Sequence, residues 1–311
     1  MSTHHLSRRG FLGCAGAAAA GLAAFGSATA AAEPSRDIID CHAHIYADDD
    51  RTYAPIEKPY RPPAGKGTIA HLRKELQAAG VRSAAAIHTF TYYGWDNRFT
   101  ADACRDGRDV MTGVVLLNPD DPQSPATLER YVREYNIRGL RFINHQKTGR
   151  LDEPGNNALL ATCERLGITA CALTNRDSRP QIETLAARYP KLSLVVDHAL
   201  NLVAGKDYQA ILEDMLALAA LPNVNAKLSH VVTGSAEEYP FRDMHDSCHQ
   251  IIQAFGPQRC VWGSDFPCEL WCPKATYAQH LRVFTHELGL DEETRRKILC
   301  ETPRRLGFAT R

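Results

Sequence analysis

The sequence has no excess of either charge, because 36 lysines and arginines balance 36 aspartates and glutamates over 311 residues. It therefore lacks the basic surface with which proteins bind nucleic acid or an anionic membrane. It also lacks CxxC pairs and a compact cysteine framework, although it contains ten cysteines. A disulfide-stapled scaffold is excluded, and most cysteines are expected to be small core residues. Only Cys268 and Cys272 are close enough in the sequence to suggest a bridge.

No apolar run is long enough to cross a bilayer comfortably. The soft apolar stretch at 11–25 overlaps Ser7-Arg8-Arg9-Gly10-Phe11-Leu12, which resembles the twin-arginine export consensus, and small residues at 28–32 offer cleavage sites. The sequence therefore predicts a signal peptide over residues 1–32 and a single domain over residues 33–311. We expect the twin-arginine export machinery to be a partner, and the location to be periplasmic or secreted.

A glycine-rich phosphate turn is missing after the first predicted strand, which argues against a doubly wound nucleotide-binding sheet. Instead, short apolar runs alternate with longer amphipathic segments, as in parallel strands joined by right-handed crossovers. Eight strands and eight helical segments predict an α/β fold of the (β/α)₈ TIM-barrel type. The predicted strands are 38–41, 84–88, 114–117, 139–143, 168–173, 192–196, 224–228 and 260–263. The predicted helices are 69–79, 124–135, 157–166, 180–189, 208–221, 244–255, 275–288 and 292–300.

Chemically active side chains gather where these strands end, which is where barrel enzymes place their active sites. The first strand runs into His42-Ala43-His44, and alternate side chains of a strand share a face, so the two histidines point the same way. A lone strand-end histidine is more often structural than functional. Here five histidines and one carboxylate share the same rim, which reverses that balance. The predicted site residues are His42, His44, His88, Arg141, Asn175, Arg176, His198, His230 and Asp265.

These residue types suit the activation of water. Neutral imidazoles and a carboxylate can hold Zn²⁺ or a similar ion while a position stays open for water or substrate. Such an ion lowers the pKa of bound water and polarises a carbonyl. A carboxylate nearby can take the proton of the water and return it to the leaving group. Asp265, in the WGSDFP stretch at 262–267, is the predicted general base.

Four motifs together resemble a known family. They are HAH at 42–44, DH at 197–198, KLS at 227–229 and FGPQRCVWGSDFP at 255–267. They resemble the amidohydrolase superfamily, and within it the amidohydrolase-related (amidohydrolase 2) branch of 2-pyrone-4,6-dicarboxylate, sulfomuconolactone and sugar-lactone hydrolases. The resemblance covers nearly all of residues 33–311 and implies a distorted barrel. It places His42, His44 and Asp265 in the active site.

The metal expected from this resemblance is one divalent ion, with zinc as the first choice. Its predicted ligands are His42, His44, His198 and Asp265, with His145 or His230 as further candidates. Metal-dependent relatives usually take another ligand from the fourth or fifth strand, whereas the predicted fifth strand here reads ITACAL and offers no histidine. Some lactonases of the branch share this gap and need no metal. A metal-independent mechanism therefore stays open.

The predicted function is hydrolysis of a small carboxylated or polyhydroxylated lactone, because Arg141 and several loop arginines suit carboxylates. In this interpretation Asp265 activates water, and His198, Arg141 and His230 stabilise the oxyanion. The side chains of His88, Asn175 and Arg176 are further predicted substrate contacts. One alternative is a metal-dependent non-oxidative decarboxylase of an aromatic or muconate-like acid. Another is an exported binding protein without turnover. The oligomeric state stays open.

Overall fold

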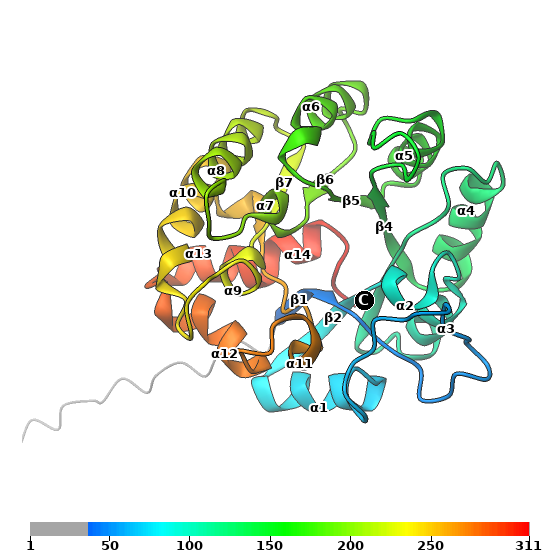
Figure 1. Ribbon diagram of the computed structural model, residues 1–311, viewed down its shortest axis with the longest axis horizontal. Helices are drawn as coiled ribbons and strands as arrows, with labels where there is room; N and C mark the ends of the chain where they lie inside the picture. The colour runs from blue at the N-terminus through cyan, green and yellow to red at the C-terminus, as the bar shows by residue number, and fades with distance from the viewer. Residues whose placement is uncertain (1–36, 311) are drawn as a thin grey trace, which may run out of the picture. The chain divides into compact units, whose positions relative to one another are not determined.

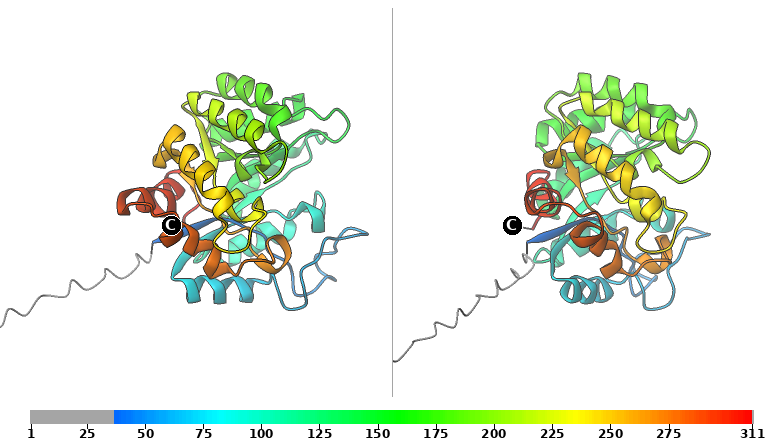
Figure 2. Two further views of the ribbon diagram at one scale, coloured as in Figure 1. Left: turned by 60° about the vertical axis from the view of Figure 1, so that its left-hand side comes forward. Right: turned by 90° about the vertical axis from the view of Figure 1, so that its left-hand side faces the viewer.

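Eight parallel strands form one sheet in the order β1 to β8. The computed structural model describes residues 37–310. Its strands curve round a common axis, and the helices lie outside them (Figures 1 and 2). This confirms the predicted barrel. The strands are β1 Ile38–Ala43, β2 Val81–Ile87, β3 Met111–Val115, β4 Ile137–Ile143, β5 Thr169–Leu173, β6 Leu194–Val196, β7 Val224–Lys227 and β8 Cys260–Val261.

The seam between β8 and β1 is looser than the other seven ladders. It contains a single parallel bridge, from Ala43 to Phe266, outside the named strands. Three backbone hydrogen bonds reinforce it: Cys41 N donates to Trp262 O at 3.1 Å, Asp265 N donates to His42 O at 2.9 Å, and His44 N donates to Phe266 O at 2.7 Å. The barrel is therefore nearly closed, and its seam brings the end of β1 against the segment that follows β8.

The main outer helices begin and end at recognisable signals. At α1, the Thr68 side chain accepts a hydrogen bond from His71 N, and Gly80 ends the helix in the left-handed conformation. The helices are α1 Ile69–Ala79, α2 Phe90–Tyr93, α3 Arg98–Asp106, α4 Ser124–Glu134, α5 Pro154–Leu166, α6 Arg179–Arg188, α7 His198–Asn201, α8 Tyr208–Ala217, α9 His230–Thr233, α10 His245–Phe255, α11 Cys268–Trp271, α12 Tyr277–Arg282, α13 Glu292–Arg296 and α14 Thr302–Arg305. Short 3₁₀ turns lie at Arg176–Ser178, Leu218–Ala220, Arg242–Met244 and Pro257–Arg259, and π-helical turns at Val283–Glu287 and Lys297–Glu301.

The helix after β2 was not predicted. It is α3, whose polar and apolar residues are divided between two faces, with Phe99 and Cys104 on the buried one. The predicted segments 275–288 and 292–300 both follow β8, so the sequence analysis placed two helices after β8 and none after β2, whereas residues 37–310 contain fourteen α-helices. The short helices α2, α7, α9 and α11 were also missed, because four-residue turns carry no amphipathic period.

A small apolar cluster fills the inside of the barrel, away from the opening at the carboxyl ends of the strands. Leu306 and Phe308, which follow α14, pack into this cluster. Thr112 donates a side-chain hydrogen bond to Phe308 O, and Thr169 donates one to Leu306 O, so strands β3 and β5 hold the chain end in place. The remaining cluster members are Ile39, Cys41, Ala85, Ile87, Val114, Cys171, Val195 and Val261.

Several predictions concern residues outside the described part of the chain. The signal peptide over 1–32 lies there, so export and location stay predictions. Among residues 37–310, no helix combines the length and apolar character that a membrane crossing requires. All nine cysteines of this range are buried, and Cys268 and Cys272 are free thiols. The bridge that their spacing left open is therefore not formed, and the cysteines pack as core residues.

Buried neutral histidines predict that the fold is sensitive to acid. Burial lowers the pKa of His88 and His280 to about 4 and that of His230 to about 3. The unfolded chain protonates histidine near pH 6.5, so between about pH 6.5 and 4 the unfolded state binds more protons than the folded state. Stability therefore falls as the pH falls through this window. We expect each histidine to contribute a slope of up to ~1.4 kcal/mol per pH unit in urea unfolding.

The variant His280→Asn isolates one of these contributions. Trp262 Nε1 donates to His280 Nδ1 at 3.1 Å, and the asparagine carbonyl oxygen takes the position of Nδ1 without a titrating ring. Burial raises the pKa values of Asp40 and Asp265, which makes the loss of stability with falling pH less steep. This effect is the same in the wild type and in the variant. The variant should therefore show a shallower loss of stability between pH 7 and 5 than the wild type. Parallel curves for the two proteins would contradict the assignment.

Candidate active site

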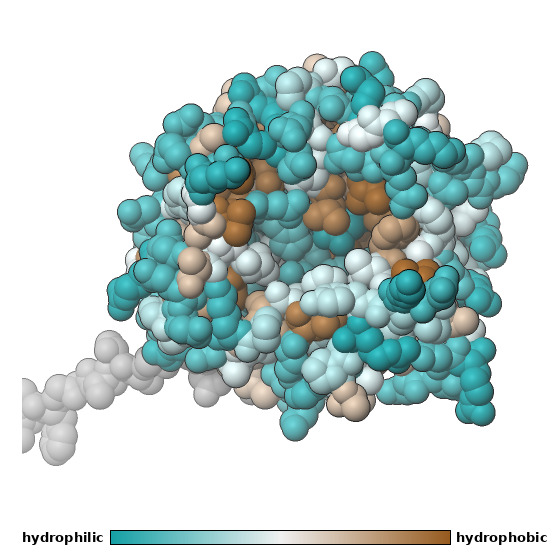
Figure 3. Space-filling model, viewed as in Figure 1, coloured by the Kyte–Doolittle hydropathy of each residue, from teal (hydrophilic) through white to brown (hydrophobic). Residues whose placement is uncertain are grey.

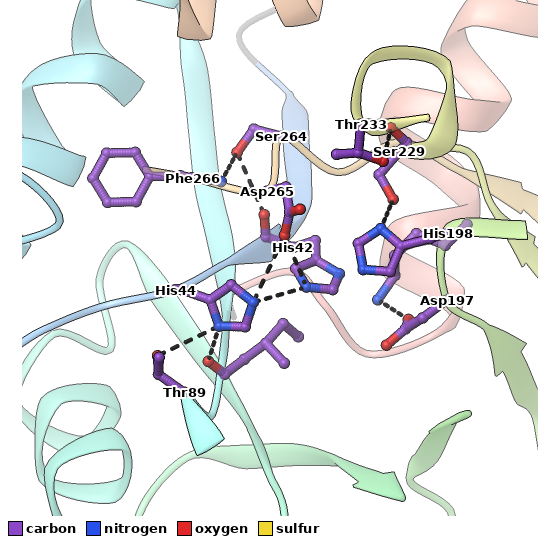
Figure 4. A network of polar contacts seen from close by, with 12 residues as sticks. His42, His44, Thr89, Asp197, His198, Ser229, Thr233, Ser264, Asp265 and Phe266 are labelled. Atoms are coloured by element: carbon purple, nitrogen blue, oxygen red, sulfur yellow. Dashed lines mark hydrogen bonds and ion pairs between the residues drawn. The ribbon is translucent and has the colours of Figure 1, made fainter. Parts of the chain in front are cut away.

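The two histidines of the HAH motif meet at the carboxyl end of β1. His42 Nε2 lies 3.2 Å from His44 Nε2, as the strand alternation predicts. His44 Nδ1 lies 3.1 Å from Ile87 O, so it carries the proton and leaves Nε2 with a lone pair. Burial lowers the pKa of both rings well below the usual range, so both are neutral. Two neutral imidazoles therefore present nitrogen atoms to the same point (Figure 4).

Asp265 comes to the same point from the end of β8. Its Oδ1 lies 3.4 Å from His42 Nε2 and 3.7 Å from His44 Nε2. The close approach requires glycine at 263, because a Cβ there would lie 2.5 Å from the Cβ of His42. Asp265 has φ 55°, a left-handed conformation that aspartate tolerates better than most residues. Burial raises the pKa of its carboxyl to about 7.

Asp40 fixes the loop that carries Asp265. This fully buried carboxylate accepts hydrogen bonds from Ser264 N at 2.9 Å and Ser264 Oγ at 2.6 Å. It also accepts from Tyr277 OH at 3.0 Å and from His42 N at 3.0 Å. Asp40 thus ties β1 to the segment after β8. Sequence reasoning missed this role, because the strand pattern alone does not show that Asp40 faces the seam.

His198 reaches the site from a left-handed turn after β6. Four successive residues, His198 to Asn201, have φ between 49° and 63°. Left-handed backbone costs roughly 1–2 kcal/mol per non-glycine residue, so the surrounding packing holds this turn in a strained form. His198 Nδ1 lies 2.7 Å from Ser229 Oγ, after β7. Its ring centroid is 4.8 Å from that of His42.

A buried charge cluster supports this group of rings. Asp197 Oδ1 lies 2.7 Å from Lys227 Nζ, and Asp197 Oδ2 lies 2.9 Å from Arg141 Nε. Burial alone would raise the pKa of Asp197, but the two cations outweigh it and lower that pKa to about 2. The free end of Arg141 extends into the site: its Nη2 lies 3.4 Å from His42 Nε2 and 3.5 Å from His198 Nε2. Arg141 thus brings a positive charge to the imidazole nitrogens.

His44, Arg141, His198 and Asp265 line one cavity of about 520 Å³ at the carboxyl end of the strands. The size is usual for a small-molecule site. The space-filling view shows the hollow at the centre of this face, with apolar side chains around it (Figure 3). Its lining residues are His44, Phe90, Thr91, Leu116, Arg141, Ile143, Leu173, His198, Asn201, Leu202, Val203, Thr233, Gly234, Asp265 and Trp271.

The model of the amidohydrolase family matches residues 39–306, which include β1 from its second residue, all of β2 to β8 and every residue that lines the cavity. The chain belongs to the amidohydrolase family. As a member it is a hydrolase with a TIM-barrel fold, as the motifs predicted. A curated relative, the L-fucono-1,5-lactonase of Burkholderia ambifaria, is 25% identical over 237 residues, which cover 74% of this chain and 80% of the relative. This places the amidohydrolase in the branch that resembles lactonases.

Two crystal structures share the fold. One, assigned as a 2-pyrone-4,6-dicarboxylic acid hydrolase from Pseudomonas putida, has a TM-score of 0.73 and 21% identity, covering 88% of this chain and 97% of the other. The second is an amidohydrolase from Burkholderia multivorans crystallised with zinc. It has a TM-score of 0.69 and 23% identity, and covers 88% of this chain and 99% of the other.

The donor atoms of this amidohydrolase fit a divalent metal. Among the described residues, His42, His44 and Asp265 form a buried group whose ligand atoms all lie within 4.8 Å of one another. Two neutral nitrogens and a carboxylate oxygen are a donor set that zinc accepts. His42 Nδ1 is buried without a hydrogen-bond partner, so no protein contact competes for the orientation of this ring. His198 was predicted as a fourth ligand, but it lies outside this group and faces Arg141 instead.

The other predicted site residues lie away from the cavity. His88 is buried behind β2, where its ring contacts Gly94 O at 2.7 Å and Thr100 Oγ1 at 3.2 Å. The ring of His230 is buried with Nε2 3.5 Å from Ser247 Oγ. His145 lies 2.8 Å from Asp120 Oδ1 on an outer loop. None of the three appears among the residues that line the cavity.

The two predicted contacts after β5 also face away from the cavity. Asn175 is exposed and accepts a hydrogen bond from Asp177 N, which caps the following 3₁₀ turn. Arg176 Nε lies 2.8 Å from Asp214 Oδ2, on α8. Among the residues that line the cavity, His44, Arg141, His198 and Asp265 were predicted, and the other lining residues were not. They lie on the short helices α2, α7, α9 and α11 and at apolar strand ends, where the sequence carries no chemical signal.

Proposed function

We propose that this amidohydrolase opens a lactone ring by attack of an activated water molecule, with Asp265 as the general base. The observation that carries the proposal is the position of the carboxylate. Asp265 lines the same cavity as Arg141 and His198, at the carboxyl ends of the strands. A base and two groups able to bind an oxyanion thus surround one space large enough for a small ring. This arrangement meets the geometric requirements for acyl transfer to water.

The steps follow from the residues around the cavity. The Arg141 guanidinium binds the carbonyl oxygen of the lactone and stabilises the negative charge that develops on it. His198, held by Ser229, borders the same space and orients the substrate. Asp265 takes a proton from water as the oxygen of that water attacks the carbonyl carbon. It then returns the proton to the ring oxygen as the C–O bond breaks, which gives a hydroxy acid.

We also propose that His42, His44 and Asp265 hold one divalent metal, with zinc as the expected ion. When bound, it would polarise the carbonyl and lower the pKa of the attacking water. Elemental analysis of the purified protein should find about one zinc per chain, and His44→Ala should abolish the binding. Removal of the ion with a chelator should lower the rate, and added zinc should restore it. Undiminished hydrolysis by metal-free protein would contradict an essential metal and assign the polarisation to Arg141 alone.

The function is tested with a panel of five- and six-membered lactones, assayed by proton release at constant pH. Hydrolysis of any of them with saturation kinetics, lost on heat denaturation, supports the proposal. Release of CO₂ from an aromatic carboxylic acid, without hydrolysis of a lactone, would overturn it in favour of decarboxylation. Tight binding of a lactone without turnover would instead support an exported binding protein.

A further inference from the structure

We propose that the lactone carries an apolar alkyl or aryl substituent, because beside the reacting groups most of the cavity wall is formed by apolar side chains. This inference rests on the proposed lactonase function and adds a substrate class to it. It departs from the carboxylated or polyhydroxylated substrate that the sequence suggested. It also differs from the sugar lactone and the dicarboxylic acid that appear in the names of the similar proteins above.

The apolar part of the wall is continuous. Leu116, Ile143 and Leu173 follow or end the neighbouring strands β3, β4 and β5, and all three line the cavity. Phe90 of α2, Leu202 after α7 and Trp271 of α11 line it from the loops. A substituent on a lactone ring bound at Arg141 and Asp265 would therefore contact these apolar side chains. Apolar walls with a few placed polar groups are the usual form of a site for an apolar ligand.

Cations that could bind a carboxylated substrate are scarce in this cavity. Arg141 is the one lysine or arginine among the lining residues, and its Nε is already bound to Asp197. The loop cations that first suggested a carboxylate are paired elsewhere: Arg61 Nη2 lies 2.7 Å from Asp50 Oδ2, and Arg176 binds Asp214. A dicarboxylate would leave one charge without a partner in a largely apolar cavity, which is costly.

Partners for several hydroxyl groups are scarce as well. The Asn201 amide lines the cavity, but its Nδ2 donates to Thr174 O at 2.9 Å. Thr233 Oγ1 donates to Ser229 O at 3.2 Å. A polyhydroxylated ring would lose hydrogen bonds to water and recover few of them here.

The mouth of the cavity continues the apolar wall to the surface. Among residues 37–310, the exposed large hydrophobic side chains are Ile56, Tyr60 and Val203. Val203 is a lining residue and is 50% exposed, and the other two contact α2 and α11, which contribute lining residues. Tyr60 packs its ring 5.1 Å from that of Trp271, while Ile56 N donates to Tyr92 O in α2. An apolar patch at the entrance of a site is a sign of an apolar ligand. The substituent would run along the wall toward these residues.

The test is a series of δ-lactones with alkyl substituents of increasing length, compared with L-fucono-1,5-lactone and 2-pyrone-4,6-dicarboxylate. We expect kcat/KM to rise about fourfold for each added methylene until the chain reaches the mouth. The two polar substrates should be hydrolysed less efficiently than the alkyl lactones. A preference for either polar substrate would overturn the inference while leaving the lactonase function intact.

A variant at the mouth tests the direction of the substituent. Val203→Asp places a charge beside the alkyl chain, and it should lower the ratio of kcat/KM for the longest alkyl lactone to that for the unsubstituted lactone by roughly tenfold. Its control is Ala187→Asp, which adds the same charge to the exposed outer face of α6 and should leave the ratio at the wild-type value. An equal ratio in both variants would contradict the predicted path.

Binding of 2-alkylcyclohexanones separates the two proposals. These ketones keep the carbonyl and the alkyl chain but contain no ester bond to hydrolyse. Affinity measured by calorimetry that increases with chain length supports an apolar substituent, whether or not any lactone is hydrolysed. Failure to hydrolyse every lactone in the panel would overturn only the lactonase function. Affinity that does not respond to chain length would overturn the inference about the substituent.

Discussion

Asp265→Asn is expected to lower kcat by roughly 10²–10⁴-fold, the contribution typical of a positioned general base. Asparagine has the same shape but cannot take a proton from water. The change removes no ion pair with lysine or arginine and keeps the backbone bond from residue 265 N to His42 O at 2.9 Å. Proton release from a lactone that the wild type hydrolyses, measured at saturating substrate, gives kcat directly. Thermal unfolding of the same sample shows whether the variant is folded.

The matched control is Asp109→Asn, the same chemical change on the outside of the barrel. Asp109 pairs with Arg73 at 2.8 Å and its side chain is 61% exposed. The turnover of the Asp109→Asn variant should stay within about twofold of the wild type, since exposed ion pairs contribute little to stability. Zinc content must be measured in both variants, because Asp265 is also a candidate ligand. Unchanged turnover in a folded Asp265→Asn protein would show that another group activates the water.

The barrel could be predicted from the sequence because its eight strands are short, apolar and evenly separated by amphipathic helices. Parallel strands of this kind have few alternative topologies. The helix α3 was missed because its nine residues contain two arginines and two aspartates, which hide the apolar face formed by Phe99 and Cys104. The strand boundaries shifted by a few residues, since hydrogen bonds between neighbouring strands, and not the apolar run itself, set where a strand ends.

The reacting end of the site could be predicted for a similar reason. His42, His44 and Asp265 lie at strand ends, and the closure of the sheet makes β8 the neighbour of β1. The apolar wall could not be predicted, because it is assembled from short helices whose position depends on tertiary packing. The roles of Asn175 and Arg176 could not be predicted either: whether a residue after a strand turns into the cavity or out to α8 depends on the loop conformation.

The pairing inside the charge cluster also depends on tertiary structure. The register that aligns Val196 of β6 with Ala226 of β7 places the residues that follow, Asp197 and Lys227, side by side. The sequence shows a lysine and an aspartate at two strand ends, but the 2.7 Å contact between them requires this register. Burial of both side chains then makes the contact important for stability.

Asp197→Asn is accordingly expected to lower the free energy of unfolding by about 3–5 kcal/mol, the cost of leaving buried charge without a partner. Asparagine fits the same space, but Arg141 and Lys227 would then face each other's charge with no carboxylate between them. Lys227 is fully buried, and its pKa is raised despite burial because Asp197 lies beside it. Urea unfolding at pH 7 measures the loss. The control Asp214→Asn, which removes the outer pairs with Arg176 and Arg179, should cost no more than about 1 kcal/mol.

The double variant Asp197→Asn/Lys227→Met separates the charge effect from the loss of a hydrogen bond. If unpaired positive charge causes the instability, removing Lys227 as well should recover part of the loss, because Arg141 is then the only cation left in the cluster. Methionine matches the length of lysine and packs against Phe308, which lies 5.5 Å from the lysine Nζ. A double variant less stable than Asp197→Asn would show that Lys227 stabilises the barrel through packing or through Cys171, 4.0 Å away. Partial recovery would instead identify Asp197 as the residue that allows two cations to be buried beneath the active site.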